Sequence, residues 1–132
     1  PFAKTLRLPR RPAIMETALV IQRKPMFIAM NRFKVKHGQE AAFEAVWKNR
    51  DTHLRGVPGF KAFSLLKGPQ RDDHTLYSSH TVWATAGTFE AWTKSEAFRA
   101  AHRNAGDNSG LYLSHPEFEG FEVVQEALPE HA

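Results

Sequence analysis

The chain has 132 residues, of which 42% are hydrophobic and 24% charged, so it is long enough for one globular domain with its own core. No apolar run approaches the roughly 18 residues of a membrane-spanning helix, and the absence of cysteine excludes disulfides, iron–sulfur clusters and thiolate ligands. The net charge of +4 is concentrated in residues 1–25, which carry +5, so it gives little support for nucleic-acid binding. We therefore expect a protein of the reducing cytoplasm that binds neither nucleic acid nor membrane.

Residues 1–25 form a basic N-terminal extension that differs from the rest of the chain. The extension lacks the apolar core and cleavage site of a signal peptide, although its Arg-rich character leaves a targeting role open. We expect it to be loosely ordered and partly derived from vector or upstream sequence, with Met15 or Met26 as the natural start. The predicted domain spans residues 26–126, and residues 127–132 form a short C-terminal tail.

The pattern from Met26 onwards predicts a strand, a helix and a turn. Alternate residues of the strand share one apolar face: Phe27, Ala29, Asn31, Phe33 and Val35. A helix follows from about Gln39, with apolar residues and one arginine at helical spacing: Phe43, Val46, Trp47, Arg50 and Leu54. The sequence Gly56-Val57-Pro58-Gly59 then predicts a turn.

The second half of the chain predicts a hairpin, a helix and a last strand. The hairpin strands cover residues 60–67 and 75–83, with Gly68-Pro69 and a polar stretch between them. Thr88 is the predicted N-cap of a helix that continues to about His102. Glycines predict a mobile loop over residues 104–113, and a last strand is expected at about residues 118–125.

The resulting order, β-α-β-β-α-β, is typical of ferredoxin-like α+β folds, in which an antiparallel sheet carries both helices on one face. The first strand also has apolar side chains, Ile28 and Met30, on its second face. Since a sheet that is apolar on both faces needs cover on both, we expect two copies to pack face to face as a homodimer.

Asn31 is an unusual residue for the apolar face of a strand. A buried amide without hydrogen-bond partners costs about 1–3 kcal/mol. Its side chain therefore either satisfies the backbone of a neighbouring loop or donates into a pocket between the sheet and the helices.

Trp92 and His102 lie on the second predicted helix and each has two interpretations. Trp92 is either a core residue or a pocket wall, and His102 is either a helix-end histidine or an axial metal ligand. In one straight helix their side chains would point roughly 80° apart, so they share a pocket only if the helix kinks near Lys94-Ser95. His115, which follows the predicted loop, is the main rival to His102 as a ligand.

Standard catalytic signatures are absent from the sequence: it has no nucleophile elbow, phosphate loop, zinc-protease helix or dinucleotide fingerprint. Their absence weighs against a hydrolase, a kinase or a dehydrogenase.

Three segments instead resemble the IsdG-type haem-degrading monooxygenases: Ala29-Met30-Asn31-Arg32-Phe33, Thr81-Val82-Trp83, and residues 89–102, which end in Ala100-Ala101-His102. That group belongs to the antibiotic-biosynthesis-monooxygenase superfamily of dimeric α+β barrels. The resemblance covers about residues 26–126.

The resemblance implies roles for four residues. His102 would be the axial ligand of the haem iron, Asn31 would hydrogen-bond the iron-bound oxygen species, and Trp92 would distort the macrocycle. Arg50 falls near a basic position of the family and would help to bind the cofactor. Haem would be both substrate and cofactor, and O2 and electrons from an external reductase would open the ring to a bilin-type product and free iron.

Three other functions stay open from the sequence. A cofactor-independent quinol or polyketide monooxygenase of the same fold would need no axial ligand. A non-catalytic haem-binding protein would use His102 without turnover. A dimer with only a structural or interaction role would need none of these residues.

Overall fold

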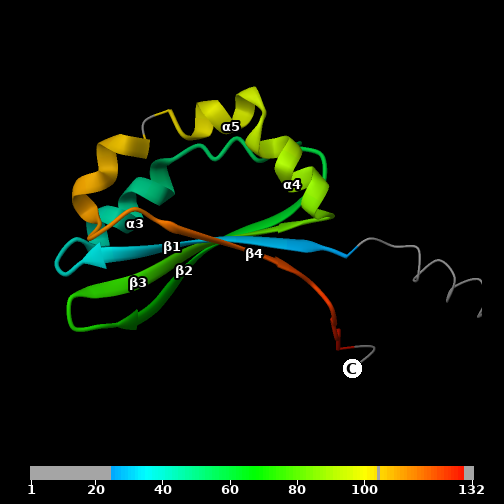
Figure 1. Cartoon of the computed structure of the whole chain (residues 1–132). Helices are drawn as coiled ribbons and strands as arrows, with labels where there is room; N and C mark the ends of the chain where they lie inside the picture. The colour runs from blue at the N-terminus through cyan, green and yellow to red at the C-terminus, as the bar shows by residue number, and fades with distance from the viewer. Residues whose placement is uncertain (1–24, 104, 130–132) are drawn as a thin grey trace, which may run out of the picture.

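The computed structural model describes residues 25–103 and 105–129, so the expected N-terminal extension lies almost entirely outside the described residues. The described elements are β1 (Phe27–Lys36), α3 (Glu40–Asn49), β2 (Phe60–Gln70), β3 (His74–Trp83), α4 (Ala86–Thr93), α5 (Glu96–Ala101), the 3-10 helix η1 (Ala105–Leu111) and β4 (Glu117–Glu122). The strands form one antiparallel sheet in the order β2-β3-β1-β4, and the helices cover one of its faces (Figure 1). The predicted ferredoxin-like α+β fold is therefore confirmed. None of these described helices is long and apolar enough to cross a membrane.

Two hydrophobic clusters lie between the sheet and the helices, and the central strand β1 contributes to both. One cluster contains Ala29, Leu54, Trp83, Trp92 and Ala101, and the other contains Phe33, Val35, Phe43 and Tyr77. Asn31 lies on the same face of β1, between Ala29 of one cluster and Phe33 of the other. The inner face of the sheet therefore becomes polar at the junction of the two clusters.

Helix α3 is shorter than the sequence predicted. Arg50 at its C-cap has extended backbone angles, with φ −82° and ψ 135°, so the helix cannot continue to Leu54. The Oδ1 atom of Asp51 accepts a hydrogen bond from the backbone N–H of His53 at 2.9 Å, a local turn that competes with helical hydrogen bonding. The prediction of Leu54 as a helical residue was wrong, although its side chain is buried in the core.

The β2–β3 hairpin is longer than predicted. Gly68 and Pro69, which were expected in the connection, lie inside β2, where the pairing register shifts between Lys67 and Gln70. An irregular pairing of this kind tolerates a proline, because a residue in a bulge need not donate to the ladder of backbone hydrogen bonds.

Three smaller differences concern the ends of two elements and the content of one loop. Thr85, not the predicted Thr88, is the N-cap of α4: its side chain accepts from the backbone N–H of Thr88 at 3.1 Å, and the Thr88 hydroxyl accepts in return from the backbone N–H of Thr85 at 3.3 Å. The segment expected as a loop contains the 3-10 helix η1. The last strand ends at Glu122, before the predicted residue 125.

The second predicted helix is interrupted and forms α4 and α5. Ser95 begins α5, because its side chain accepts a hydrogen bond from the backbone N–H of Phe98 at 3.1 Å. The break falls at Lys94-Ser95, where the sequence required a kink for Trp92 and His102 to line one pocket.

The outer face of the sheet has apolar side chains, as expected for a face that needs cover. Ile28 and Met30 of β1 pair with Val82 and His80 of β3, and Phe121 of β4 beside Ile28 is 44% exposed. The homodimer stays a prediction that this apolar face supports.

Gly56 and Gly59 both adopt positive φ in the predicted turn, at +80° and +83°. An added Cβ at Gly59 would lie 2.4 Å from the Cβ of Thr88, whereas at Gly56 it would meet no atom within 4 Å. We expect Gly56→Ala to lower the free energy of unfolding by about 1 kcal/mol, from the backbone conformation alone. Gly59→Ala should lower it by roughly 2–4 kcal/mol, because the collision adds to that cost. Urea unfolding of both variants measures the difference, and equal losses would contradict it.

Candidate active site

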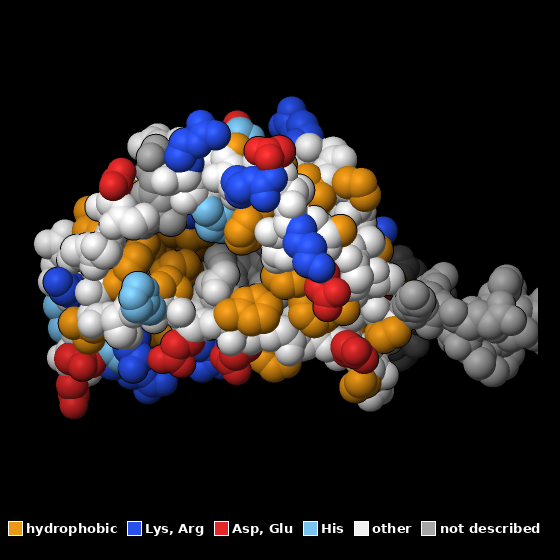
Figure 2. All heavy atoms as spheres, turned by 45° about the horizontal axis from the view of Figure 1, so that its top comes forward, with side chains coloured by type: hydrophobic (Ala, Val, Ile, Leu, Met, Phe, Trp, Pro, Cys, Tyr) orange, Lys and Arg blue, Asp and Glu red, His pale blue; other side chains and the backbone are white. Residues whose placement is uncertain are grey.

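A cavity of about 880 Å³ lies between the inner face of the sheet and the helices. Figure 2 shows it as a hollow lined by hydrophobic side chains, with histidine side chains beside it. Its lining includes Ala29 and Phe33, one from each hydrophobic cluster, so the cavity occupies the gap between the clusters. A largely apolar hollow of this size with a few polar groups is typical of a small-molecule site.

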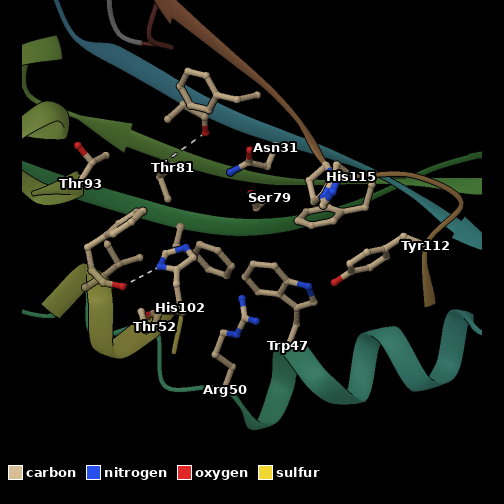
Figure 3. Close-up of a pocket in the computed structure, with 18 of the residues that line it drawn as sticks. Asn31, Trp47, Arg50, Thr52, Ser79, Thr81, Thr93, His102, Tyr112 and His115 are labelled. Atoms are coloured by element: carbon tan, nitrogen blue, oxygen red, sulfur yellow. Dashed lines mark hydrogen bonds between the residues drawn. The ribbon is translucent and has the colours of Figure 1, made fainter. Parts of the chain in front are cut away.

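All four residues predicted for the site line this cavity: Asn31, Arg50, Trp92 and His102. They come from four places in the fold, namely β1, the end of α3, α4 and the end of α5. His115, the rival ligand, also lines the cavity, from the segment before β4 (Figure 3). The structure thus brings the predicted residues together, while their chemical roles stay predictions.

The side chain of Asn31 points into the cavity (Figure 3). Across the sheet it lies between Ser79 on β3 and Phe118 on β4. The side-chain hydrogen bonds of nearby sheet residues go elsewhere, and none among the described residues involves the Asn31 amide. Of the two interpretations, the described contacts therefore favour an amide that is free to bind a molecule in the cavity.

His102 is held at the C-terminal end of α5 in one orientation. Its Nδ1 lies 2.8 Å from the carbonyl oxygen of Phe98, and its ring stacks on the Phe98 ring with centroids 4.1 Å apart. Because a carbonyl only accepts, Nδ1 must carry the proton, which leaves the lone pair of Nε2 free in the neutral ring. A histidine that caps a helix end can therefore also be a metal ligand, since each role uses a different nitrogen.

Trp92 is both a core residue and a wall of the cavity. It is 6% exposed, stacks on Trp83 with centroids 6.1 Å apart, and meets the Phe98 ring edge-on at 5.5 Å. These contacts fix the indole in place. The two interpretations from the sequence therefore apply together, and any ligand of the cavity meets an indole that cannot easily move.

Arg50 and Tyr112 make the lining favourable to an anion. The guanidinium of Arg50 lies 4.5 Å from the centre of the Trp47 ring, and none of the described residues that line the cavity is Asp or Glu. Burial raises the pKa of the Tyr112 hydroxyl and the charge of Arg50 opposes this rise, so Tyr112 stays a neutral donor at neutral pH. A cation that forms no ion pair with the described residues, in a lining without carboxylates, suits a ligand that has an acidic group.

The sequence did not indicate three further lining residues, Trp47, Ser79 and Tyr112. Ser79 lies between Tyr77 and Thr81 on the inner face of β3, so the period-two pattern of the strand already indicated that its side chain faces the helices. Trp47 was assigned only to helix packing and Tyr112 only to the loop. Their place at the cavity depends on how α3 and η1 pack on the sheet, which no local pattern describes.

The described part of the chain thus forms a ferredoxin-like α+β domain with a largely apolar cavity between its sheet and its helices. The family model described as antibiotic biosynthesis monooxygenase matches residues 26–104, and the chain belongs to this family. The resemblance found in the sequence is thereby confirmed, and so is the expectation of an enzyme of the monooxygenase class.

Three similar proteins illustrate the range of the family. A haem oxygenase (staphylobilin-producing) from Staphylococcus haemolyticus is 33% identical over 84 residues, which are 64% of this chain and 80% of that protein. The structure of the haem degrader MhuD from Mycobacterium tuberculosis, with two haems bound in its active site, has 25% identity and a TM-score of 0.58, covering 76% of this chain and 98% of MhuD. The structure of SnoaB, a cofactor-independent oxygenase from Streptomyces nogalater, has 28% identity and a TM-score of 0.56, covering 80% of this chain and 98% of SnoaB.

Proposed function

We propose that this protein is a haem-degrading monooxygenase that uses the cavity as its active site. The main observation is that Asn31 on β1, Trp92 on α4 and His102 at the end of α5 line one apolar cavity between the sheet and the helices. The similarity to the staphylobilin-producing haem oxygenase and to MhuD supports the same function.

The residues of the cavity fit haem in three respects. Nε2 of His102 is a free imidazole nitrogen, the usual protein ligand of a haem iron. The apolar side chains suit the faces of a porphyrin, and the Arg50 guanidinium suits its carboxylates. The described residues contain no cluster of three or more His, Asp or Glu that could hold a metal ion by itself, and haem does not need one because the porphyrin supplies the other ligands.

Each side chain then has a distinct task. His102 would hold the haem by its iron, and Arg50 would orient it by a carboxylate. Asn31 would donate its amide N–H on the sheet side of the cavity, and Trp92 would press its fixed indole against the ligand. Bound haem would supply the iron that reacts with O2 and the ring that is opened, with electrons from an external donor.

The remaining expectations belong to this proposal. We propose a reductase partner as the source of electrons, a homodimer as the working assembly, and the cytoplasm as the compartment. The apolar outer face of the sheet supports the homodimer.

Titration with haemin, followed by ascorbate in air with catalase present, tests the proposed function. We expect a Soret band to form and then to decay to the absorbance of a bilin. A Soret band that persists under ascorbate would indicate a haem-binding protein without turnover. If no band forms, a cofactor-independent monooxygenase becomes the better interpretation, which the similarity to SnoaB also permits.

A further inference from the structure

Ser79 is a buried hydroxyl at the cavity that the proposed function does not use. It is 7% exposed, lines the cavity, and lies directly opposite Asn31 in the pairing of β1 with β3. Figure 3 shows the two side chains on neighbouring strands, at the same part of the cavity. We propose that the Ser79 hydroxyl and the Asn31 amide act as a pair that binds one water molecule in the resting protein and hydrogen-bonds the small ligand that replaces it.

The surroundings set this pair apart from the rest of the sheet. Across the sheet, Ser79 is followed by Leu65 on β2, and Asn31 is followed by Phe118 on β4. Along β1 the neighbours of Asn31 on the same face are Ala29 and Phe33. Two polar side chains therefore lie next to each other among largely apolar neighbours. The next hydroxyl on the inner face of β3, that of Thr81, already donates to the carbonyl oxygen of Ala29 and accepts from the indole N–H of Trp83.

The hydroxyl of Ser79 lacks the partners that the neighbouring hydroxyls have. Ser78 donates to the carbonyl oxygen of Ser79 at 2.9 Å, and the Thr81 hydroxyl accepts from the indole N–H of Trp83 at 2.9 Å. No side-chain hydrogen bond of Ser79 occurs among the described residues, although a buried hydroxyl without a partner costs about 1–3 kcal/mol. Among the described residues, Trp47 Nε1 is the one side-chain N or O atom that is both inaccessible and without a hydrogen-bond partner. Since Ser79 Oγ also has no partner, it must still be accessible, and Ser79 lines the cavity.

The hydroxyl adds a second hydrogen-bonding group beside the amide. The Asn31 amide donates through its NH2 group and accepts through its oxygen, and the Ser79 hydroxyl donates one hydrogen bond and accepts up to two. Together the two side chains can bind a molecule that both donates and accepts, such as water, or an acceptor such as azide. The first state, in which the pair binds water in the resting protein, needs no haem. The second state, in which the pair binds a small ligand beside haem, rests on the proposed function.

A high-resolution crystal structure of the protein without haem tests the first state. We expect a water molecule in hydrogen-bond contact with both Ser79 Oγ and the Asn31 amide. Ser79→Ala should lose this water, and Ser79→Thr, which keeps a hydroxyl, should retain it. Ser78→Ala is the matched control, because Ser78 is equally buried at 7% but lies on the outer face of the same strand. Absence of the water from the unaltered protein, or its persistence in Ser79→Ala, would overturn the pair.

Azide affinity of the haemin-loaded protein tests the second state. We expect Ser79→Ala to weaken azide binding roughly fivefold, the effect of one hydrogen bond, and Ser79→Thr and Ser78→Ala to change it less than about twofold. Unchanged azide affinity in Ser79→Ala would overturn the ligand-binding role even if the water is lost. If the unaltered protein binds no haemin, the proposed function fails, and the crystallographic water alone decides whether the pair exists.

Discussion

Replacing His102 with alanine is expected to weaken haemin binding by at least roughly a hundredfold and to remove the Soret band at micromolar protein. The reason is geometric: Nδ1 is fixed on the Phe98 carbonyl, which leaves Nε2 as the nitrogen available to iron. Spectroscopic titration with haemin measures the affinity. Far-UV circular dichroism and thermal unfolding check that loss of the ring from the end of α5 has not unfolded the protein.

The matched control for this variant is His115→Ala, because His115 also lines the cavity. We expect its haemin affinity to stay within about threefold of the unaltered protein. Added imidazole should restore a Soret band to His102→Ala by occupying the vacated position. A normal titration in His102→Ala together with a lost one in His115→Ala would transfer the ligand role to His115.

Replacing Asn31 with alanine should separate binding from turnover. We expect haemin affinity within about threefold of the original, but ascorbate-driven ring opening slower by roughly 10²–10³, the usual effect of removing one well-placed donor at a reacting oxygen. The Soret band would then form normally and persist. Single-turnover decay of this band, followed with catalase present, measures the effect.

Thr93→Ala is a suitable control for Asn31→Ala. Thr93 also lines the cavity, but its hydroxyl already donates to the carbonyl oxygen of Glu90 in its own helix at 2.7 Å. Its removal should change the rate of ring opening by less than about twofold. Equal losses in both variants would show that general disturbance of the cavity, not the Asn31 amide, slows the reaction.

The sheet was predictable from the sequence because one face of each strand meets the core. The alternation from Phe27 to Val35 predicted the inner face of β1. Element ends were harder to predict, because they depend on local hydrogen bonds. Thr85 and Thr88 are equally good cap residues, and only the folded backbone shows which one begins the helix.

The candidate site was predictable only in part. Asn31 was conspicuous because it is polar on an apolar face, and His102 and Trp92 were recognisable through the resemblance. Arg50 also came from the resemblance, although not its position at the early end of α3. Tyr112 and Ser79 were missed, since Tyr112 reaches the cavity only through the packing of η1. Such contacts join segments far apart in the chain, so the local spacing of apolar residues does not predict them.

Because the cavity lies between the two hydrophobic clusters, a ligand bound in it would also affect the stability of the fold. An empty gap leaves β1 and β3 as the elements common to both clusters, whereas a flat, apolar ligand would join them into one continuous interior. A ligand that binds only the native state raises stability in proportion to the logarithm of its concentration over its dissociation constant. If haem is that ligand, each catalytic cycle removes the molecule that completes the interior. The lifetime of the protein against proteolysis would then follow the supply of its own substrate.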